Sequence, residues 1–354
     1  MKNWQRLKKD QNFKQKLLVR EQVIDAMRLF FKTRNYHEVE TPLLVAKPGA
    51  EPYLNLFETS LGTLDGQNKT AFLLTSPEYA MKKLLVADLG NIFQICKSFR
   101  NVESLGGTHN PEFTILEWYH VGINYFDLMS EFEEMMLAIC SHLGVEASQF
   151  SYQGRLYDLA KPYLRFSIAE LFERYVGLNK DQLLSLEALR EQAQKRNYEL
   201  HSLEKLTDDL AWEELYNQLF LNEIEPKLAE FNQPVFVYDY PAPQAALARK
   251  KSDDPRFAER FEVYLAGMEL GNAFGELTDA LEQEKRLLAD LEMRSVLGKK
   301  SQPIDDDFIE ALQEGLPETS GIAVGVDRLV MLFADTDSID ETLFFPASEI
   351  FADL

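Results

Sequence analysis

The segment of residues 92–119 constrains the fold of this chain more than any other stretch. Two apolar-rich arms flank a polar loop that carries Gly106 and Gly107, which is the pattern of a β-hairpin. The second arm alternates between two faces, with Glu112, Thr114, Leu116 and Trp118 on one and Phe113, Ile115, Glu117 and Tyr119 on the other. Arg100 closes the first arm. A solvated hairpin could carry such charges, so the charges by themselves do not indicate a functional site.

Periodicity predicts the elements around this hairpin. Apolar residues recur at helical spacing over residues 17–34, and residues 38–41 then read as extended before Pro42, which disfavours helix in the residue that precedes it. Residues 47–69 are rich in Gly, Pro, Asn and Asp and read as a loop around a short strand at 54–58. Further predicted elements are a strand at 72–75, a helix from Ser76, a helix at 125–143 closed by Gly144, an extended segment with glycine breaks at 261–277, helices at 279–297 and 304–313, and a final glycine-bearing strand that runs into a helix.

Composition makes nucleic acid a poor default partner. The chain has 354 residues, with 37 Lys and Arg against 58 Asp and Glu, and its net charge of −21 repels phosphate backbones. No apolar run has the length of a signal peptide core or of a membrane span, so we expect a soluble cytoplasmic protein. Cys96 and Cys140 lie in apolar stretches and are expected to be core residues, because two cysteines make neither a disulfide framework nor a thiolate metal cluster.

Three segments together resemble the signature motifs of class II aminoacyl-tRNA synthetases, in the lysyl branch. The string FRN…HNPEFTILEWY is similar to motif 2, the helix, strand and Pro42 near the N-terminus resemble motif 1, and SGIAVGVDRLVML resembles motif 3. The likeness is greatest to the short paralogues that attach β-lysine to elongation factor P. It implies an α+β fold, with a mainly antiparallel sheet flanked by helices, and a homodimer built on motif 1. We expect one domain over residues 1–354, with 167–232 as a helical insertion between motifs 2 and 3.

The resemblance also assigns the reacting groups. Amino-acid activation joins a carboxylate to the α-phosphorus of ATP, and arginine suits this reaction because its planar fork binds phosphate and carboxylate oxygens in pairs. Arg100 would hold the α-phosphate and the substrate carboxylate, and Arg328 the γ-phosphate, with Asp327 orienting Arg328. Glu262 and Glu269, on one extended segment, would hold the Mg²⁺ that accompanies ATP, although two such glutamates are otherwise ordinary surface charges.

A lysine-like substrate needs a buried anion opposite its side-chain ammonium, because an isolated buried charge is costly. By resemblance, Glu276 with Tyr119 supplies this anion. Glu78 would recognise the other amino group, or it serves only the positive end of its helix. The other substrate contacts that the resemblance implies are Ser76, Asn272, Phe274 and Ala323, and the other ATP contacts are Asn101, Glu103, His109, Asn110, Phe113, Leu270 and Gly325. His109 could equally be a loop histidine without a catalytic role.

Two positions depart from the lysyl-tRNA synthetase pattern. The motif 2 loop is one residue longer, with Val102 between Asn101 and Glu103, where the family has arginine, asparagine and glutamate in succession. Motif 3 has Ala323 where lysyl-tRNA synthetases have glycine, and alanine is what the elongation factor P ligases carry. A methyl group at the pocket wall would favour a substrate whose amino group is moved by one carbon.

The expected acceptor is a protein. The motif 1-like helix begins close to the start of the chain, which leaves no room for the anticodon-binding domain of a full lysyl-tRNA synthetase. We therefore expect lysine or β-lysine to be activated with ATP and Mg²⁺ and passed to a lysine side chain of elongation factor P, with neither tRNA nor membrane as a partner. Two alternatives stay open: a minimal lysyl-tRNA synthetase that charges tRNA, and a catalytically silent paralogue that binds an amino acid and regulates a partner.

Overall fold

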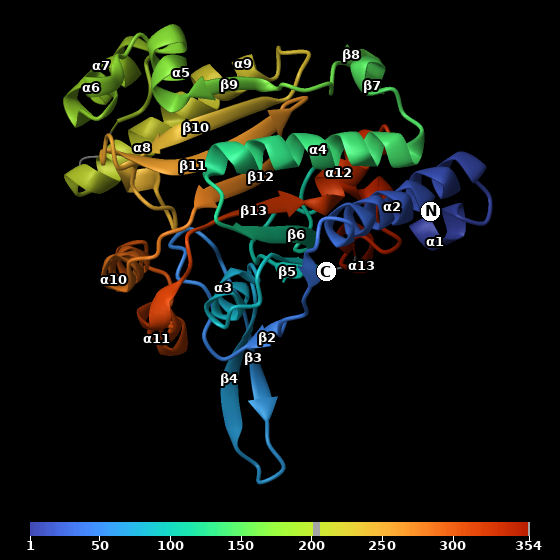
Figure 1. Ribbon diagram of the computed structural model, residues 1–354, viewed down its shortest axis with the longest axis horizontal. Helices are drawn as coiled ribbons and strands as arrows, with labels where there is room; N and C mark the ends of the chain where they lie inside the picture. Colours follow the sequence, from blue (N-terminus) through green and yellow to red (C-terminus); the bar gives the residue numbers. More distant parts are fainter. Residues whose placement is uncertain (201–205, 353–354) are drawn as a thin grey trace.

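The computed structural model describes residues 1–200 and 206–352, and its centre is an eight-stranded sheet (Figure 1). In spatial order the strands are β1 (His37–Glu38), β5 (Ile92–Phe99), β6 (Glu112–Val121), β13 (Thr319–Gly325), β12 (Met268–Gly275), β11 (Phe257–Leu265), β10 (Val235–Pro241) and β9 (Leu164–Ser167). All neighbours are antiparallel except the β1–β5 and β10–β9 pairs at the two edges. This arrangement confirms the expected α+β fold and the expected hairpin of β5 and β6.

One face of the sheet is covered by α2 (Gln11–Lys32), α4 (Tyr125–Leu143) and α12 (Val326–Phe333) (Figure 1). Leu116 and Trp118, which alternate with the charged positions of β6, are fully buried in this core. α4 has the predicted bounds, because the Asn124 side chain caps its first turn and Gly144 ends it in a left-handed conformation with φ 68°. α2 begins at Gln11 rather than at residue 17. The Asp10 side chain caps this earlier start, because it accepts a hydrogen bond from the Phe13 amide.

The other face of the sheet is bordered by α3 (Glu78–Val86), α10 (Ala280–Val296) and α11 (Asp306–Gly315). Met81, Leu287 and Phe308 from these helices form one buried cluster with Ile92 and Tyr119 of the sheet. The predicted helices are confirmed, with starts one or two residues later than expected at α10 and α11. This second face carries the candidate site.

The expected insertion is helical. It contains α5 (Ile168–Tyr175), α6 (Lys180–Leu183), α7 (Leu186–Lys195), α8 (Asp208–Leu219), η3 (Phe220–Ile224) and α9 (Glu225–Leu228). These helices share a second hydrophobic cluster with β10 and β11, in which Leu215 and Tyr216 lie with Val235 and Tyr264. The insertion thus packs on the outer strands of the main sheet. Residues 201–205 of the expected insertion lie outside the described residues.

Two predictions about strands were wrong. Residues 47–69 form no simple loop, because β3 (Phe57–Gly62) and β4 (Asn68–Leu73) make a projecting hairpin that joins β2 (Leu44–Val45) in a small sheet (Figure 1). Most of β3 is exposed, so its sequence lacks the alternation that marks a half-buried strand. Residues 261–277 form two strands rather than one, since the chain reverses at Ala266 and Gly267, which both have positive φ.

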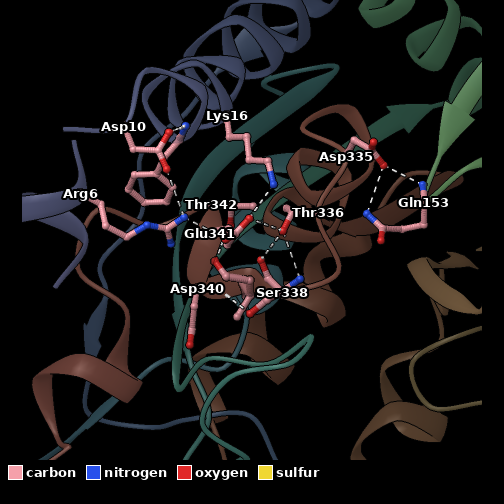
Figure 2. A network of polar contacts seen from close by, with 12 residues as sticks. Arg6, Asp10, Lys16, Gln153, Asp335, Thr336, Ser338, Asp340, Glu341 and Thr342 are labelled. Atoms are coloured by element: carbon pink, nitrogen blue, oxygen red, sulfur yellow. Dashed lines mark hydrogen bonds and ion pairs between the residues drawn. The ribbon is translucent and has the colours of Figure 1, made fainter. Parts of the chain in front are cut away.

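The N-terminal helices are tied to the C-terminal segment by a polar network (Figure 2). Glu341 of η5 (Ile339–Glu341) accepts from Arg6 of α1 (Asn3–Arg6) at 3.2 Å, from Lys16 of α2 at 2.6 Å and from Thr336 at 3.1 Å. The same segment supports the loop between β5 and β6, because the Ile339 amide donates to the Gly107 carbonyl at 2.7 Å. The remaining elements are η1 (Ala147–Gln149), β7 (Phe150–Tyr152), β8 (Arg155–Tyr157), η4 (Ala242–Gln244) and α13 (Ala347–Ile350).

No helix in residues 1–200 and 206–352 is both long enough and apolar enough to cross a lipid bilayer.

Candidate active site

The strand register brings five of the predicted site residues onto one face of the sheet: Tyr119, Glu262, Asn272, Phe274 and Ala323. One row across five strands pairs Glu262, Asn272, Ala323, Glu117 and Gln94 in succession. The neighbouring row pairs Arg260, Phe274, Gly321, Tyr119 and Ile92. Glu269 stands opposite Tyr264 on the next strand, so the β11–β12 hairpin places the two predicted metal ligands on adjacent strands.

A buried lysine joins the two carboxylates expected to bind substrate. Lys82 Nζ lies 2.6 Å from Glu78 Oε1 and 2.6 Å from Glu276 Oε2, and the side chains of Lys82 and Glu276 are each 1% exposed. Glu276 is therefore already paired rather than a free anion, which corrects the expected picture. Lys82 was missed in the sequence, although its position four residues after Glu78 on a helix predicts contact between the two.

Glu117 is a second site residue that the sequence-based assignment left out. It is 1% exposed and accepts hydrogen bonds from Ser76 Oγ at 2.6 Å and from Tyr119 OH at 3.3 Å. Burial, reinforced by the charge of Glu78, raises the pKa of Glu117 to about 8. The available signal was a lone charge on the site face of an otherwise apolar strand.

A glycine gives this pocket its shape. A Cβ at Gly321 would lie 2.3 Å from the Tyr119 ring and 2.6 Å from Glu276 Oε1, so only glycine lets these two side chains approach the strand. Glu78 and Glu276 then flank the Lys82 ammonium, and the Glu117 carboxylate lies within electrostatic range of Glu78 and Lys82. When all three carboxylates are ionised, the pocket has an excess negative charge that a cationic ligand would neutralise.

The two predicted phosphate-binding arginines lie toward the other end of the site. Arg328, in the first turn of α12, donates to the Glu269 carbonyl at 2.6 Å, and its Nη2 lies 3.1 Å from His109 Nε2. Burial and the charge of Arg328 lower the pKa of His109, which favours the neutral imidazole as hydrogen-bond acceptor. The Arg100 guanidinium lies 5.2 Å from the centre of the Phe113 ring, and its Nε is buried without a hydrogen-bond partner.

Asp327 was expected to orient Arg328, but the hydrogen bonds of its two carboxylate oxygens go to other residues. Its Oδ1 pairs with Arg20 Nη1 of α2 at 2.5 Å, and its Oδ2 accepts from the Thr114 amide at 2.6 Å. Arg20 Nη2 also donates to Thr114 Oγ1 at 2.5 Å. Asp327 thus joins segments from the three sequence motifs instead of contacting its neighbour.

The predicted metal ligands fit a cation that is shared with phosphate. Glu262 accepts hydrogen bonds from Tyr240 OH at 2.7 Å, from Tyr264 OH at 2.5 Å and from Arg260 Nη2 at 2.5 Å. Much of the capacity of its carboxylate to accept hydrogen bonds is therefore already used. The Glu269 side chain is 42% exposed, yet the surrounding protein atoms still desolvate its carboxylate. This desolvation, together with the charge of Glu262, raises the pKa of Glu269. No cluster of three or more His, Cys, Asp or Glu suited to a metal occurs among the described residues. Two carboxylates with an open side suit Mg²⁺ bound partly by ATP, because Mg²⁺ takes few protein ligands beside substrate phosphates.

Two of the expected ATP contacts, Asn110 and Asn101, form hydrogen bonds within the protein. The Asn110 amide donates to the Glu112 carbonyl at 2.6 Å and accepts from the Ala347 amide at 3.0 Å, which anchors the loop to α13. The Asn101 amide donates to the Leu56 carbonyl at 3.3 Å and accepts from the Val102 amide at 2.9 Å. Each side chain thus uses part of its hydrogen-bonding capacity to hold its loop.

The remaining predicted residues lie at the site with different degrees of access. Val102, the extra loop residue, has φ 58° and is 81% exposed, and Glu103 follows it in a half-buried position. Leu270 is 1% exposed in the helix-covered core, so only its backbone can face a nucleotide. Gly325 precedes the first turn of α12, and Asn272 accepts from Arg260 Nε at 3.1 Å.

Comparison with known proteins gives a consistent result. The family model described as tRNA synthetases class II (D, K and N) matches residues 2–349. A protein of Pectobacterium atrosepticum is 40% identical over 335 residues, covering 93% of this chain and 94% of its own length. A protein of Histophilus somni is 40% identical over 333 residues, with 94% of each chain covered, and one of Enterobacter sp. is 39% identical over 332 residues. All three relatives carry the name elongation factor P–(R)-β-lysine ligase.

Proposed function

The chain belongs to the class II (D, K and N) tRNA synthetase family, and on that basis we propose that it activates lysine or (R)-β-lysine with ATP and transfers it to a lysine side chain of elongation factor P. The names of its relatives, which are (R)-β-lysine ligases of elongation factor P, support this choice of amino acid and acceptor. The enzyme is accordingly a ligase that forms an amino-acid adenylate and releases pyrophosphate.

The charge of the substrate pocket is the observation that indicates which amino acid the protein activates. Glu78 and Glu276 pair with the Lys82 ammonium, and Glu117 adds a third carboxylate within electrostatic range. A ligand with two ammonium groups would balance this excess, and both lysine and β-lysine have two. Ala323 lies between Asn272 and Glu117 in one row across the sheet. Its methyl group would influence where the substrate amino group can lie.

The arginines account for the activation step. Charge builds on the phosphate oxygens as the substrate carboxylate attacks the α-phosphorus, so fixed positive groups lower the barrier. Arg100 would hold the substrate carboxylate against the α-phosphate, and Arg328 would hold the γ-phosphate while His109 and the Glu269 carbonyl keep its guanidinium in place. Mg²⁺, held by Glu262 and Glu269, would neutralise phosphate charge when bound.

We further propose a homodimer that works in the cytoplasm. Large apolar side chains are exposed along α2 and the segment after β1, among them Leu29 at 56% and Leu44 at 43%. Burial of such a surface against a second copy would remove this exposure, and two-fold pairs are the commonest assembly.

One labelling experiment tests the function. The protein is incubated with Mg-ATP, labelled α-lysine or β-lysine, and both unmodified elongation factor P and tRNA. Label on elongation factor P, strongest with β-lysine, is expected. Label on tRNA would instead indicate a minimal synthetase, and absence of ATP–pyrophosphate exchange with every lysine isomer would indicate a catalytically silent paralogue.

A further inference from the structure

A glutamate on the loop between β2 and β3 shares a cavity with the substrate pocket. The cavity has a volume of about 370 Å³ and is lined on one side by loop residues that include Lys47 and Glu51, and on the other by Ser76, Glu78 and Tyr79. Ser76 and Glu78 belong to the carboxylate pocket described above. Glu51 would therefore face a substrate bound in this pocket, although none of the three sequence motifs contains it.

The Glu51 carboxylate is positioned but unsatisfied. Its Oε2 atom is buried and has no hydrogen-bond partner. The carboxylate occupies the space above Gly49, where a Cβ would be 2.3 Å from Oε2, so this arrangement requires glycine at position 49. The loop backbone is held from α10, because Arg294 Nη1 donates to the carbonyls of Glu51 at 2.8 Å and Leu54 at 2.9 Å. A carboxylate held in this way is free to act on a ligand.

The groups around Glu51 give it a raised proton affinity. Burial is the main cause of its raised pKa, and the charge of Glu78 on α3 adds to it, whereas Arg100 at the end of β5 and Arg294 on α10 oppose it. Tyr79 on α3 and Asp290 on α10 also lie within electrostatic range of this carboxylate. Glu51 thus lies within electrostatic range of both Glu78, which is assigned to the substrate ammonium, and Arg100, which is assigned to the α-phosphate. The reactive carbonyl of the adenylate would join these two ends.

We propose that Glu51 is the base that takes a proton from the acceptor lysine during transfer, a role that rests on the proposed function. The acceptor ammonium gives one proton to the Glu51 carboxylate. The neutral amine then attacks the adenylate carbonyl carbon, a C–N bond forms, and the C–O bond to phosphate breaks with its electron pair leaving on AMP. The second proton of the attacking nitrogen goes to the departing phosphate or to water.

The acceptor needs such a base because lysine is almost wholly charged at neutral pH. With an ordinary pKa of about 10.4, fewer than about one amine in a thousand is neutral at pH 7. A positioned base contributes typically about 10²–10⁴-fold to such a step. Adenylate formation involves no amine attack and so does not need Glu51.

The test separates adenylation from transfer in E51Q, E51D and the control E310Q, which changes an exposed carboxylate of α11. ATP–pyrophosphate exchange measures the first step, and a single-turnover chase of the enzyme-bound adenylate into elongation factor P measures the second. For E51Q we expect exchange within about twofold of wild type and transfer slowed at least about 100-fold at pH 7. The deficit should shrink as pH approaches about 10, where the acceptor ammonium loses its proton to water without help from Glu51. E51D should recover part of the rate, and E310Q should match wild type.

Other outcomes overturn this role. Transfer by E51Q at the wild-type rate, a parallel loss of exchange and transfer, or a deficit that is constant with pH would each exclude Glu51 as the base. A wild-type protein that performs no exchange, or that leaves elongation factor P unlabelled, would instead overturn the proposed function itself and with it the role of Glu51.

Discussion

Arg20 of α2 and Asp327 of α12 form an ion pair of 2.5 Å in the first turn of α12, next in sequence to the proposed γ-phosphate arginine. The side chain of Arg20 is 12% exposed and that of Asp327 is 3% exposed, and both also hold Thr114 of β6. The helix that resembles motif 1, the strand of motif 2 and the helix of motif 3 therefore meet at one buried contact. Since Arg328 is the next residue after Asp327, this contact fixes the backbone position from which the Arg328 side chain extends.

Removal of the Arg20 charge should weaken ATP binding. We expect R20M to raise the KM for ATP in ATP–pyrophosphate exchange about tenfold, because α12 loses the anchor of its first turn. It should also lower the free energy of unfolding by about 3 kcal/mol, as expected for a broken buried pair. R20K keeps the positive charge, so its KM for ATP and its free energy of unfolding should lie between those of wild type and R20M. An unchanged KM for ATP in a folded R20M variant would show that the pair serves stability alone.

Ionisation of Glu117 should make substrate binding pH-dependent. Its pKa of about 8 in the free protein means that it is largely protonated at pH 6, and a cationic ligand favours the charged form. Affinity for lysine isomers should therefore rise with pH up to about pH 8, by at most about tenfold per pH unit, with proton release on binding. Calorimetry in buffers of different ionisation enthalpy measures this release. E117Q should bind more weakly and show no pH dependence from this group.

The same carboxyl should reduce the stability of the free protein above neutral pH. Because its pKa is raised from 4.5 to about 8 on folding, the folded state binds more protons than the unfolded state between these values. Stability consequently falls as pH rises through this window, and E117Q removes that loss. We expect the Tm difference between E117Q and wild type to shift in favour of the variant from pH 5 to pH 8, and a difference independent of pH would contradict the assignment.

Replacement of Ala323 tests substrate choice. A323G removes the methyl group between Asn272 and Glu117 and should shift the ratio of kcat/KM from β-lysine toward α-lysine by roughly tenfold, as one methylene-sized group is worth about 1–3 kcal/mol in a pocket. The measurement is ATP–pyrophosphate exchange with each isomer. An unchanged ratio would exclude Ala323 as a determinant of the isomer.

Glu269 should set the magnesium requirement. E269Q removes one of the two proposed ligand carboxylates, so the Mg²⁺ concentration for half-maximal ATP–pyrophosphate exchange should rise about tenfold or more. The variant keeps the Arg328 hydrogen bond to the Glu269 carbonyl but loses the 3.9 Å ion pair between Arg328 and the Glu269 carboxylate. E292Q, an amide in place of a carboxylate on α10, is the control and should leave the requirement unchanged.

Glu341 should stabilise the junction of the two chain ends. Burial opposes its charge, but Lys16 and Arg6 outweigh burial and lower its pKa, so its contribution is present above the ordinary glutamate pKa and is lost as pH falls through the lowered value. E341Q should therefore reduce the free energy of urea unfolding by about 1 kcal/mol at pH 7, with the difference vanishing in acid. Equal stabilities at pH 7 would show that the network in Figure 2 adds no net energy.

Local pattern was sufficient for the elements whose signals lie within a few consecutive residues. The β5–β6 hairpin, the α4 helix with its Gly144 end and the β13–α12 unit follow from periodicity and end residues, and the motif resemblance predicted the family and most of the site face. The sequence failed where a strand is exposed on both sides, as in β3, and where a tight turn divides an apolar run, as at Gly267.

What the sequence determined, then, is the set of side chains on each strand and helix, because alternation and helical spacing are local properties of the chain. Only the tertiary structure decided which charges meet. Asp327 is partnered by Arg20, at a sequence separation of 307 residues, and Glu276 is paired with Lys82. No local pattern specifies such partners. A buried charge needs an opposite one within a few ångströms, and the packing of the sheet and its helices determines which residue lies there.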